Sequence, residues 1–158
     1  MKVISPTCGE LSVEMLRKEI RRYIEEDREA DYRIIIGTDS KTNRKTTMFV
    51  TALILCRIGK GARFFFHRSR ESPIYHLSER IYKETELSLE WMEELKNHGI
   101  MQMLAAWPIE IHLDIGKHGD TRKLIQEIVG WITSVGCVAR IKPDAFGASA
   151  VADKYTKT

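Results

Sequence analysis

No stretch of this sequence is apolar over a length that could cross a bilayer, and its beginning, Met1 to Pro6, lacks the apolar core of a signal peptide. Cysteine is scarce. The three cysteines are odd in number and match no metal-ligand spacing, so we expect reduced thiols in a cytoplasmic protein. Repeats, low-complexity tracts and linkers are also lacking, which predicts a single domain over residues 1–158.

The composition is that of an ordinary globular protein, but the charges are distributed unevenly along the chain. The segment from Ser40 to Arg70 holds eight lysines and arginines and no acid, whereas residues 71–104 hold seven acids and three bases. A basic stretch of this kind is as consistent with a surface that follows a phosphate backbone as with solvated strand ends. Charge alone therefore leaves nucleic-acid binding open.

The first half of the chain predicts a helix and three strands after an irregular arm at residues 1–10. Ser12 is expected to cap the helix, which has an apolar stripe of Met15, Leu16, Ile20, Tyr23 and Ile24. A buried strand then runs from Arg33 to a terminal Asp39, and strands at residues 46–57 and 62–67 complete an antiparallel meander. Asp39 is either a turn residue or a ligand, depending on which other carboxylates reach it.

A long helix is predicted from Leu77 to His98, and it carries a second candidate carboxylate. At 100° per residue, Glu84 falls inside the apolar arc of this helix, while Glu86 falls on the opposite side. A glutamate aimed at the core is rare unless it has a partner. The partner is either a core-lining arginine or lysine, or a cation held together with Asp39.

The last third of the chain predicts two further strands, at residues 109–115 and 137–141, each followed by a helix. The first of these strands ends near Asp114, and the final helix, at residues 148–157, carries Asp153. The connector at residues 100–108 has exposed-looking apolar residues that suggest a partner surface, namely Met101, Met103 and Trp107. The helix between the two strands has one apolar half and one polar half.

This order of elements predicts an α/β fold: a five-stranded mixed sheet, with three antiparallel strands and then two parallel crossovers, flanked by helices, with an extra N-terminal helix. Right-handed crossovers would place Asp39 and Asp114 side by side at the carboxyl ends of neighbouring strands. Glu84 and Asp153 could join them from two helices. Four converging carboxylates repel one another unless a divalent cation is present, and oxygen ligands favour Mg²⁺ or Mn²⁺.

Four segments of the chain resemble the ribonuclease H-like superfamily and, within it, the uncharacterised bacterial YkuK-type family. The resemblance covers roughly residues 10 to 158, and the order and spacing of the segments are more specific than any one of them. The segments are Gly37-Thr38-Asp39-Ser40, Arg80-Ile81-Tyr82-Lys83-Glu84-Thr85, His112-Leu113-Asp114-Ile115-Gly116, and Ile141-Lys142-Pro143 with Ala152-Asp153-Lys154-Tyr155-Thr156-Lys157.

The resemblance implies roles for the four carboxylates. Asp39 would bridge two metal ions, Glu84 and Asp114 would hold one ion with it, and Asp153 would hold the other. Two departures stand out. Ser40 occupies the position where ribonuclease H proper usually has glycine, and Glu86-Leu87 imitates the Glu-Leu pair of ribonuclease H, so that Glu86 is an alternative ligand.

The activity that follows from the resemblance is two-metal hydrolysis of phosphodiester bonds in RNA, a hybrid or a branched nucleic acid. His118 is a candidate proton shuttle. The candidate phosphate-binding residues are Lys41, Arg44, Lys45, Lys117, Arg122 and Lys142. One alternative is a non-catalytic module that binds nucleic acid or protein on the same fold. A second alternative is a transition-metal site of His112, Asp114 and His118.

Overall fold

The computed structural model describes residues 2–116, 121–142 and 144–145. Lys117, His118, Asp153 and the helix predicted at residues 148–157 lie outside these ranges. The strands are β1 (Val3–Ser5), β2 (Gly9–Leu11), β3 (Tyr32–Thr42), β4 (Thr47–Arg57), β5 (Ala62–Glu71), β6 (Ile109–His112) and β7 (Val138–Arg140). The helices are α1 (Val13–Glu26), α2 (Leu77–Asn97), α3 (Ile100–Met103) and α4 (Arg122–Ser134). Across the described ranges, no helix is both long and apolar enough to cross a membrane.

The strands form one mixed sheet in the order β2-β1-β5-β4-β3-β6-β7. The antiparallel meander β3-β4-β5 and the parallel additions β6 and β7 are the five strands that the sequence predicts. The sheet nevertheless has seven strands, because residues 1–10 are not an irregular arm throughout. They supply β1 and β2, and β1 pairs with β5 at Ile4 and Phe66. The two short strands thus extend the sheet at the edge of β5.

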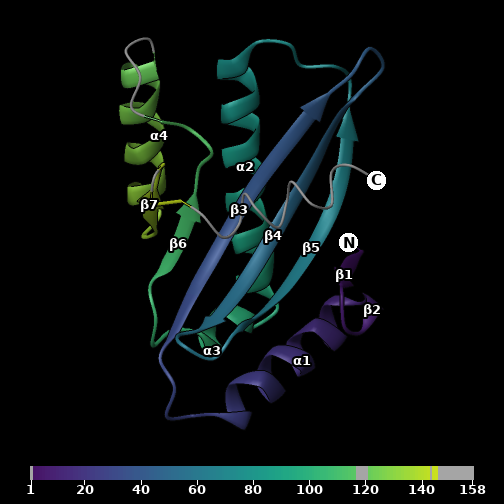
Figure 1. Cartoon of the computed structure of the whole chain (residues 1–158), viewed down its shortest axis with the longest axis vertical. Helices are drawn as coiled ribbons and strands as arrows, with labels where there is room; N and C mark the ends of the chain where they lie inside the picture. The colour runs from purple at the N-terminus through teal and green to yellow at the C-terminus, as the bar shows by residue number, and fades with distance from the viewer. Residues whose placement is uncertain (1, 117–120, 143, 146–158) are drawn as a thin grey trace.

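The two faces of the sheet have different surroundings, and this difference positions the site. Along β3, alternate side chains point to opposite faces. Ile34, Ile36, Thr38 and Ser40 point towards α2 and form what we call the helix face; Ile35, Gly37, Asp39 and Lys41 form the second face. Figure 1 shows the long strands β3, β4 and β5 crossing in front of α2.

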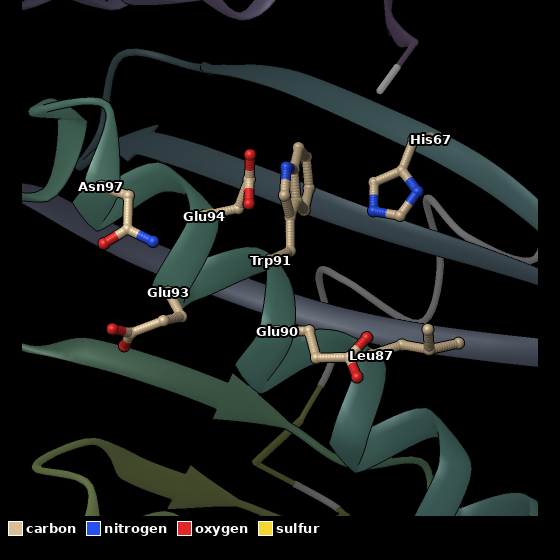
Figure 2. Close-up of a pocket in the computed structure, with 7 residues that line it drawn as sticks. All are labelled: His67, Leu87, Glu90, Trp91, Glu93, Glu94 and Asn97. Carbon is tan, nitrogen blue, oxygen red and sulfur yellow. The ribbon is translucent and has the colours of Figure 1, made fainter.

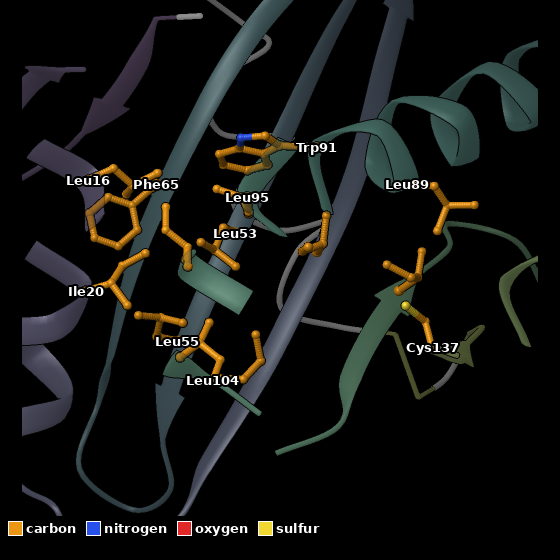
Figure 3. Close-up of a cluster of buried hydrophobic side chains, with 14 of the residues drawn as sticks. Leu16, Ile20, Leu53, Leu55, Phe65, Leu89, Trp91, Leu95, Leu104 and Cys137 are labelled. Carbon is orange, nitrogen blue, oxygen red and sulfur yellow. The ribbon is translucent and has the colours of Figure 1, made fainter. Parts of the chain in front are cut away.

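The main hydrophobic core lies between the helix face and the four described helices. It joins buried residues of α1, α2 and α4 to strand residues such as Phe65, and Figure 3 shows Leu16 and Ile20 of α1 beside that ring. The buried aromatic Trp91 brings α2 into the same cluster. Smaller apolar clusters of strand residues lie on the second face. This packing holds α2 firmly against β3.

The helices confirm most of the predicted pattern. The Ser12 hydroxyl accepts a hydrogen bond from the backbone N–H of Met15 and caps α1, although the Met15 side chain is itself half exposed. The apolar side chains of residues 100–108 that were expected to be exposed are half-buried. Residues 100–103 form α3, and its methionines and Trp107 pack against the main core, with the Trp107 ring edge-on to Tyr32.

Candidate functional site

Asp39 lies within β3 and not at its end, which corrects the sequence-based picture. The strand continues to Thr42, so the polar turn begins only at Asn43. Asp39 is paired with Val50 of β4 and points to the second face of the sheet. Its Oδ1 accepts a hydrogen bond of 2.9 Å from the backbone N–H of Ser40. The carboxylate is half-buried.

Glu84 reaches β3 from the first half of α2. Its Oε2 accepts a 2.5 Å hydrogen bond from the hydroxyl of Ser40, the residue that follows Asp39. One turn further along α2, the Ser88 hydroxyl lies 2.8 Å from the Thr38 hydroxyl, which is 3.0 Å from that of Thr51. These contacts fix the position of the helix on β3. The core-facing partner of Glu84 is thus a hydroxyl.

Burial and charge both act on Glu84. Burial, together with the negative charges of Asp39 and Asp114, raises the pKa of the Glu84 carboxyl to about 8, even though the Ser40 hydrogen bond and Arg80 act in the opposite direction. A nearby cation would stabilise the ionised form of a carboxyl whose pKa is raised in this way. Glu86, by contrast, lies 3.5 Å from the Lys83 ammonium, which also binds Glu71 at 3.0 Å. The projection that separated Glu84 from Glu86 therefore describes the helix correctly.

Asp114 follows β6, on the strand next to β3. The parallel ladder of β3 and β6 ends at the pair of Gly37 and His112, two residues before Asp39 and Asp114. Asp114 Oδ1 lies 2.5 Å from the Lys142 ammonium, and this contact, with a smaller contribution from Asp39, raises the pKa of Lys142. Both aspartates contribute to the raised pKa of Glu84.

The carboxylates are near one another but do not form a metal-binding group as they stand. Within residues 2–116, 121–142 and 144–145, no set of three His, Cys, Asp or Glu side chains is placed to hold an ion. Glu84 is bonded to Ser40, and Asp114 is bonded to Lys142. The chemistry of the donors nevertheless fits a hard divalent cation, because all three are carboxylates, and burial together with the other two charges raises the pKa of Glu84.

A buried ionic cluster on the second face was not predicted. Glu110 of β6 accepts hydrogen bonds of 2.6 and 2.9 Å from the Arg33 guanidinium, and its Oε1 lies 3.2 Å from His112 Nε2 and 3.4 Å from Arg140 Nε. Burial alone would raise the pKa of Glu110, but Arg33 and His112 hold it at about 2. The alternation Ile109-Glu110-Ile111-His112 could have predicted part of this cluster, since it places Glu110 and His112 on one face of the strand.

This cluster bears on the transition-metal alternative. His112 Nε2 lies 3.2 Å from Glu110 Oε1, and burial, the largest influence, lowers the pKa of His112. His118 lies outside the described residues. The part of the chain that the structure describes therefore gives the alternative no support.

The candidate phosphate-binding residues that can be described are all exposed. Lys41 is on the last part of β3, and Arg44 and Lys45 are in the β3–β4 turn. Arg122 begins α4, and Lys142 follows β7. Lys142 is bonded to the site carboxylate Asp114. Lys117 lies outside the described residues.

A pocket of about 350 Å³ lies apart from the carboxylates, between α2 and β5. Figure 2 shows His67 on one side of the Trp91 ring and Glu94 on the other. The two rings meet edge to face, 4.8 Å apart, and burial lowers the pKa of His67 to about 4. The pocket also has Glu90 at its wall. No residue of the sequence-based site lines it.

Two comparisons with known proteins bear on this arrangement. A family model described as Ribonuclease H-like matches residues 15–157. The chain is also similar to the uncharacterized protein YkuK of Bacillus subtilis (strain 168), with 36% identity over an alignment covering 94% of this chain and 93% of that protein. No solved structure matches the chain.

Proposed function

Because this chain belongs to the ribonuclease H-like superfamily and to its YkuK-type family, we propose that it is a nuclease that uses Mg²⁺ or Mn²⁺. The reaction is hydrolysis of phosphodiester bonds in RNA, a hybrid or a branched nucleic acid. One observation carries the proposal beyond family membership. Burial and, to a lesser extent, the charges of Asp39 on β3 and Asp114 after β6 raise the pKa of Glu84 on α2 to about 8.

In this proposal Asp39, Glu84 and Asp114 hold a divalent cation, with Asp153 as a further ligand by family resemblance. When bound, such ions activate a water molecule and stabilise the leaving oxygen of a phosphodiester. The chain supplies the remaining parts. Ser40 orients the Glu84 carboxylate through its 2.5 Å hydrogen bond. The Lys142 ammonium, 2.5 Å from Asp114 Oδ1, would bind a substrate phosphate.

A second candidate function is a module that binds nucleic acid without cutting it. The observation in its favour is that side chains of the protein itself already bind two of the three carboxylates. Ser40 bonds Glu84 at 2.5 Å, and Lys142 bonds Asp114 at 2.5 Å. In that case Asp39→Asn would leave binding intact or strengthen it, because it removes a negative charge that faces the phosphates.

The test is a cleavage assay on end-labelled RNA, RNA/DNA hybrid, branched and single-stranded DNA substrates, with Mg²⁺, with Mn²⁺ and with a chelator. We expect cleavage that needs the metal and that falls by on the order of 100-fold or more in Asp39→Asn and in Asp114→Asn. Cleavage that persists in both variants would come from a contaminant or from another site. Binding without cleavage under every condition would favour the non-catalytic module.

A further inference from the structure

At the end of the sheet that carries Asp39, the charged side chains are distributed differently on the two faces. In residues 39–50 and 66–70 there are five cations and a single acid, Asp39. Directly paired residues of antiparallel strands point to the same face. The second face therefore carries two rows across β3, β4 and β5. The rows are Asp39, Val50 and Arg68, and then Lys41, Met48 and Arg70.

The helix face of the same strands has a different character. On β5, the residue after Arg70 is Glu71, which points to the helix face and binds the Lys83 ammonium of α2 at 3.0 Å. On β3, Ser40 and Thr42 point to the same face. Ser40 donates a hydrogen bond to Glu84, and Thr42 donates one to the carbonyl of Ile74. The charges on the helix face are thus paired within the protein. The cations gather on the second face, where Arg68 and Arg70 are exposed.

The turn between β3 and β4 continues the basic surface beyond the rows. The side chain of Asn43 accepts hydrogen bonds from the backbone N–H groups of Lys45 at 2.8 Å and of Thr46 at 2.9 Å. This Asx turn fixes the backbone that presents Arg44 and Lys45. Within the described residues, neither of these side chains forms an ion pair.

We infer that the second face of β3-β4-β5, from Asp39 to the β3–β4 turn, is a track that binds the phosphate backbone of a nucleic-acid strand. This inference rests on the proposed function, since the track would lead the nucleic-acid strand to Asp39. Lys41, Arg68 and Arg70 would contact phosphates. Paired residues on strands β3 and β5 are about 10 Å apart, and residues at i and i+2 on one strand are about 7 Å apart, which spreads the cations over several nucleotides.

Between the cations, Met48 is half-buried and keeps some accessible surface. Val50 and Phe66 are buried beneath, and the Arg68 guanidinium lies 5.6 Å from the centroid of the Phe66 ring. Met48 can contact a sugar or a base without reading base edges. Contacts from lysine and arginine to phosphates position a strand but do not specify its sequence. The track should therefore bind strands of different sequence about equally.

The experiment measures binding and not cleavage, so that it stays separate from the proposed catalysis. Fluorescein-labelled single-stranded RNA and DNA of mixed and homopolymeric sequence are titrated with the full chain in a chelator, at several salt concentrations, by fluorescence anisotropy. The variants are Arg68→Gln with Arg70→Gln and, as matched control, Lys18→Gln with Arg21→Gln. The control residues are exposed on α1, and their loss changes the net charge equally.

We expect the Arg68/Arg70 variant to bind each sequence several-fold more weakly, with a slope of log affinity against log salt shallower by about 1.4, because two phosphate contacts are lost. The control should keep the slope of the unaltered chain, and Arg68→Lys with Arg70→Lys should restore it. Equal weakening in the control, an unchanged slope, or no binding by the unaltered chain would overturn the inference. Loss of cleavage alone, with this binding intact, would instead remove the proposed catalysis.

Discussion

The hydroxyl of Ser40 donates a 2.5 Å hydrogen bond to the carboxylate of Glu84, and this bond joins β3 to α2 directly beside Asp39. A glycine, the usual residue at this position in ribonuclease H proper, has no side chain and could not make it. Through this bond Glu84, and not Glu86, is the α2 carboxylate held against β3 at the residue next to Asp39, whose own side chain points to the second face. It also holds the Glu84 side chain in place before any cation binds.

The first prediction compares the two glutamates of α2. Glu84→Gln should lower metal-dependent cleavage on the order of 100-fold, because it removes a charged ligand next to Asp39. Glu86→Gln should change the rate less than about threefold, because Glu86 pairs with Lys83 away from Asp39. Single-turnover cleavage rates at saturating Mn²⁺ measure both. Equal losses in the two variants would show that α2 does not use Glu84 as a ligand.

The second prediction concerns the competition between Lys142 and a cation for Asp114. Lys142→Gln should tighten Mn²⁺ binding about two- to fivefold, since the lysine is more than half exposed and its ion pair is correspondingly weak. Asp114→Asn should weaken the same binding. Titration calorimetry with Mn²⁺ and no nucleic acid gives both affinities. An affinity that Lys142→Gln leaves unchanged would mean that the bound ion does not contact Asp114.

The third prediction is the pH dependence of stability that comes from Glu110. Its pKa is lowered from 4.5 to about 2, so its contribution is complete above pH 4.5 and is lost as the pH falls towards 2. Glu110→Gln should therefore lower the free energy of unfolding by about 2 kcal/mol at pH 7, because Arg33 loses its buried partner. Urea unfolding of the two proteins should show this difference narrowing as the pH falls from 4.5 towards 2.

The matched control for Glu110 is Glu25→Gln. Glu25 is exposed, and its carboxylate lies 3.8 Å from the Arg28 guanidinium on the same helix. Its removal should change the free energy of unfolding by less than about 1 kcal/mol at pH 7. A difference for Glu110→Gln that is as small as this, or that does not narrow in acid, would contradict the assignment of Glu110 as a buried anion.

The fourth prediction tests how α2 is held on β3. Ser88→Ala removes the 2.8 Å contact with the Thr38 hydroxyl and should destabilise the protein by about 1 kcal/mol. Ser78→Ala, at an exposed position on the same helix, should have little effect. Thermal unfolding followed by circular dichroism compares the two. If Ser88→Ala were neutral, the hydroxyl network would not contribute to helix position.

The sequence predicted the parts of the fold that a strong pattern specifies. Alternation and β-branched residues identified β3 and β4, and the helical projection separated Glu84 from Glu86 correctly. Residues 1–10 were misread, because two three-residue strands are too short for a periodic pattern. The end of β3 was also misplaced, since the polar Lys41 and Thr42 belong to the strand through pairing with Met48 and Thr47.

The sequence predicted which carboxylates make up the candidate site, but not which side chains bind them. The neighbouring positions of Asp39 and Asp114 follow from the order of the strands. The partners of Glu84 and Asp114 do not, because Ser40 and Lys142 are ordinary polar residues whose role depends on side-chain geometry. The same holds for Arg33 and Glu110, which are 77 positions apart in the chain and meet only in the folded sheet.

The pairing of β3 with β6 has a consequence for when the site can exist. The chain between Gly37 and His112 contains the rest of the meander and α2, so the loop closed by their pairing is long. Non-local pairings of this kind slow folding. We therefore expect Asp39, Glu84 and Asp114 to come together only when β6 joins the sheet, so that any activity they share would begin only with the completed sheet.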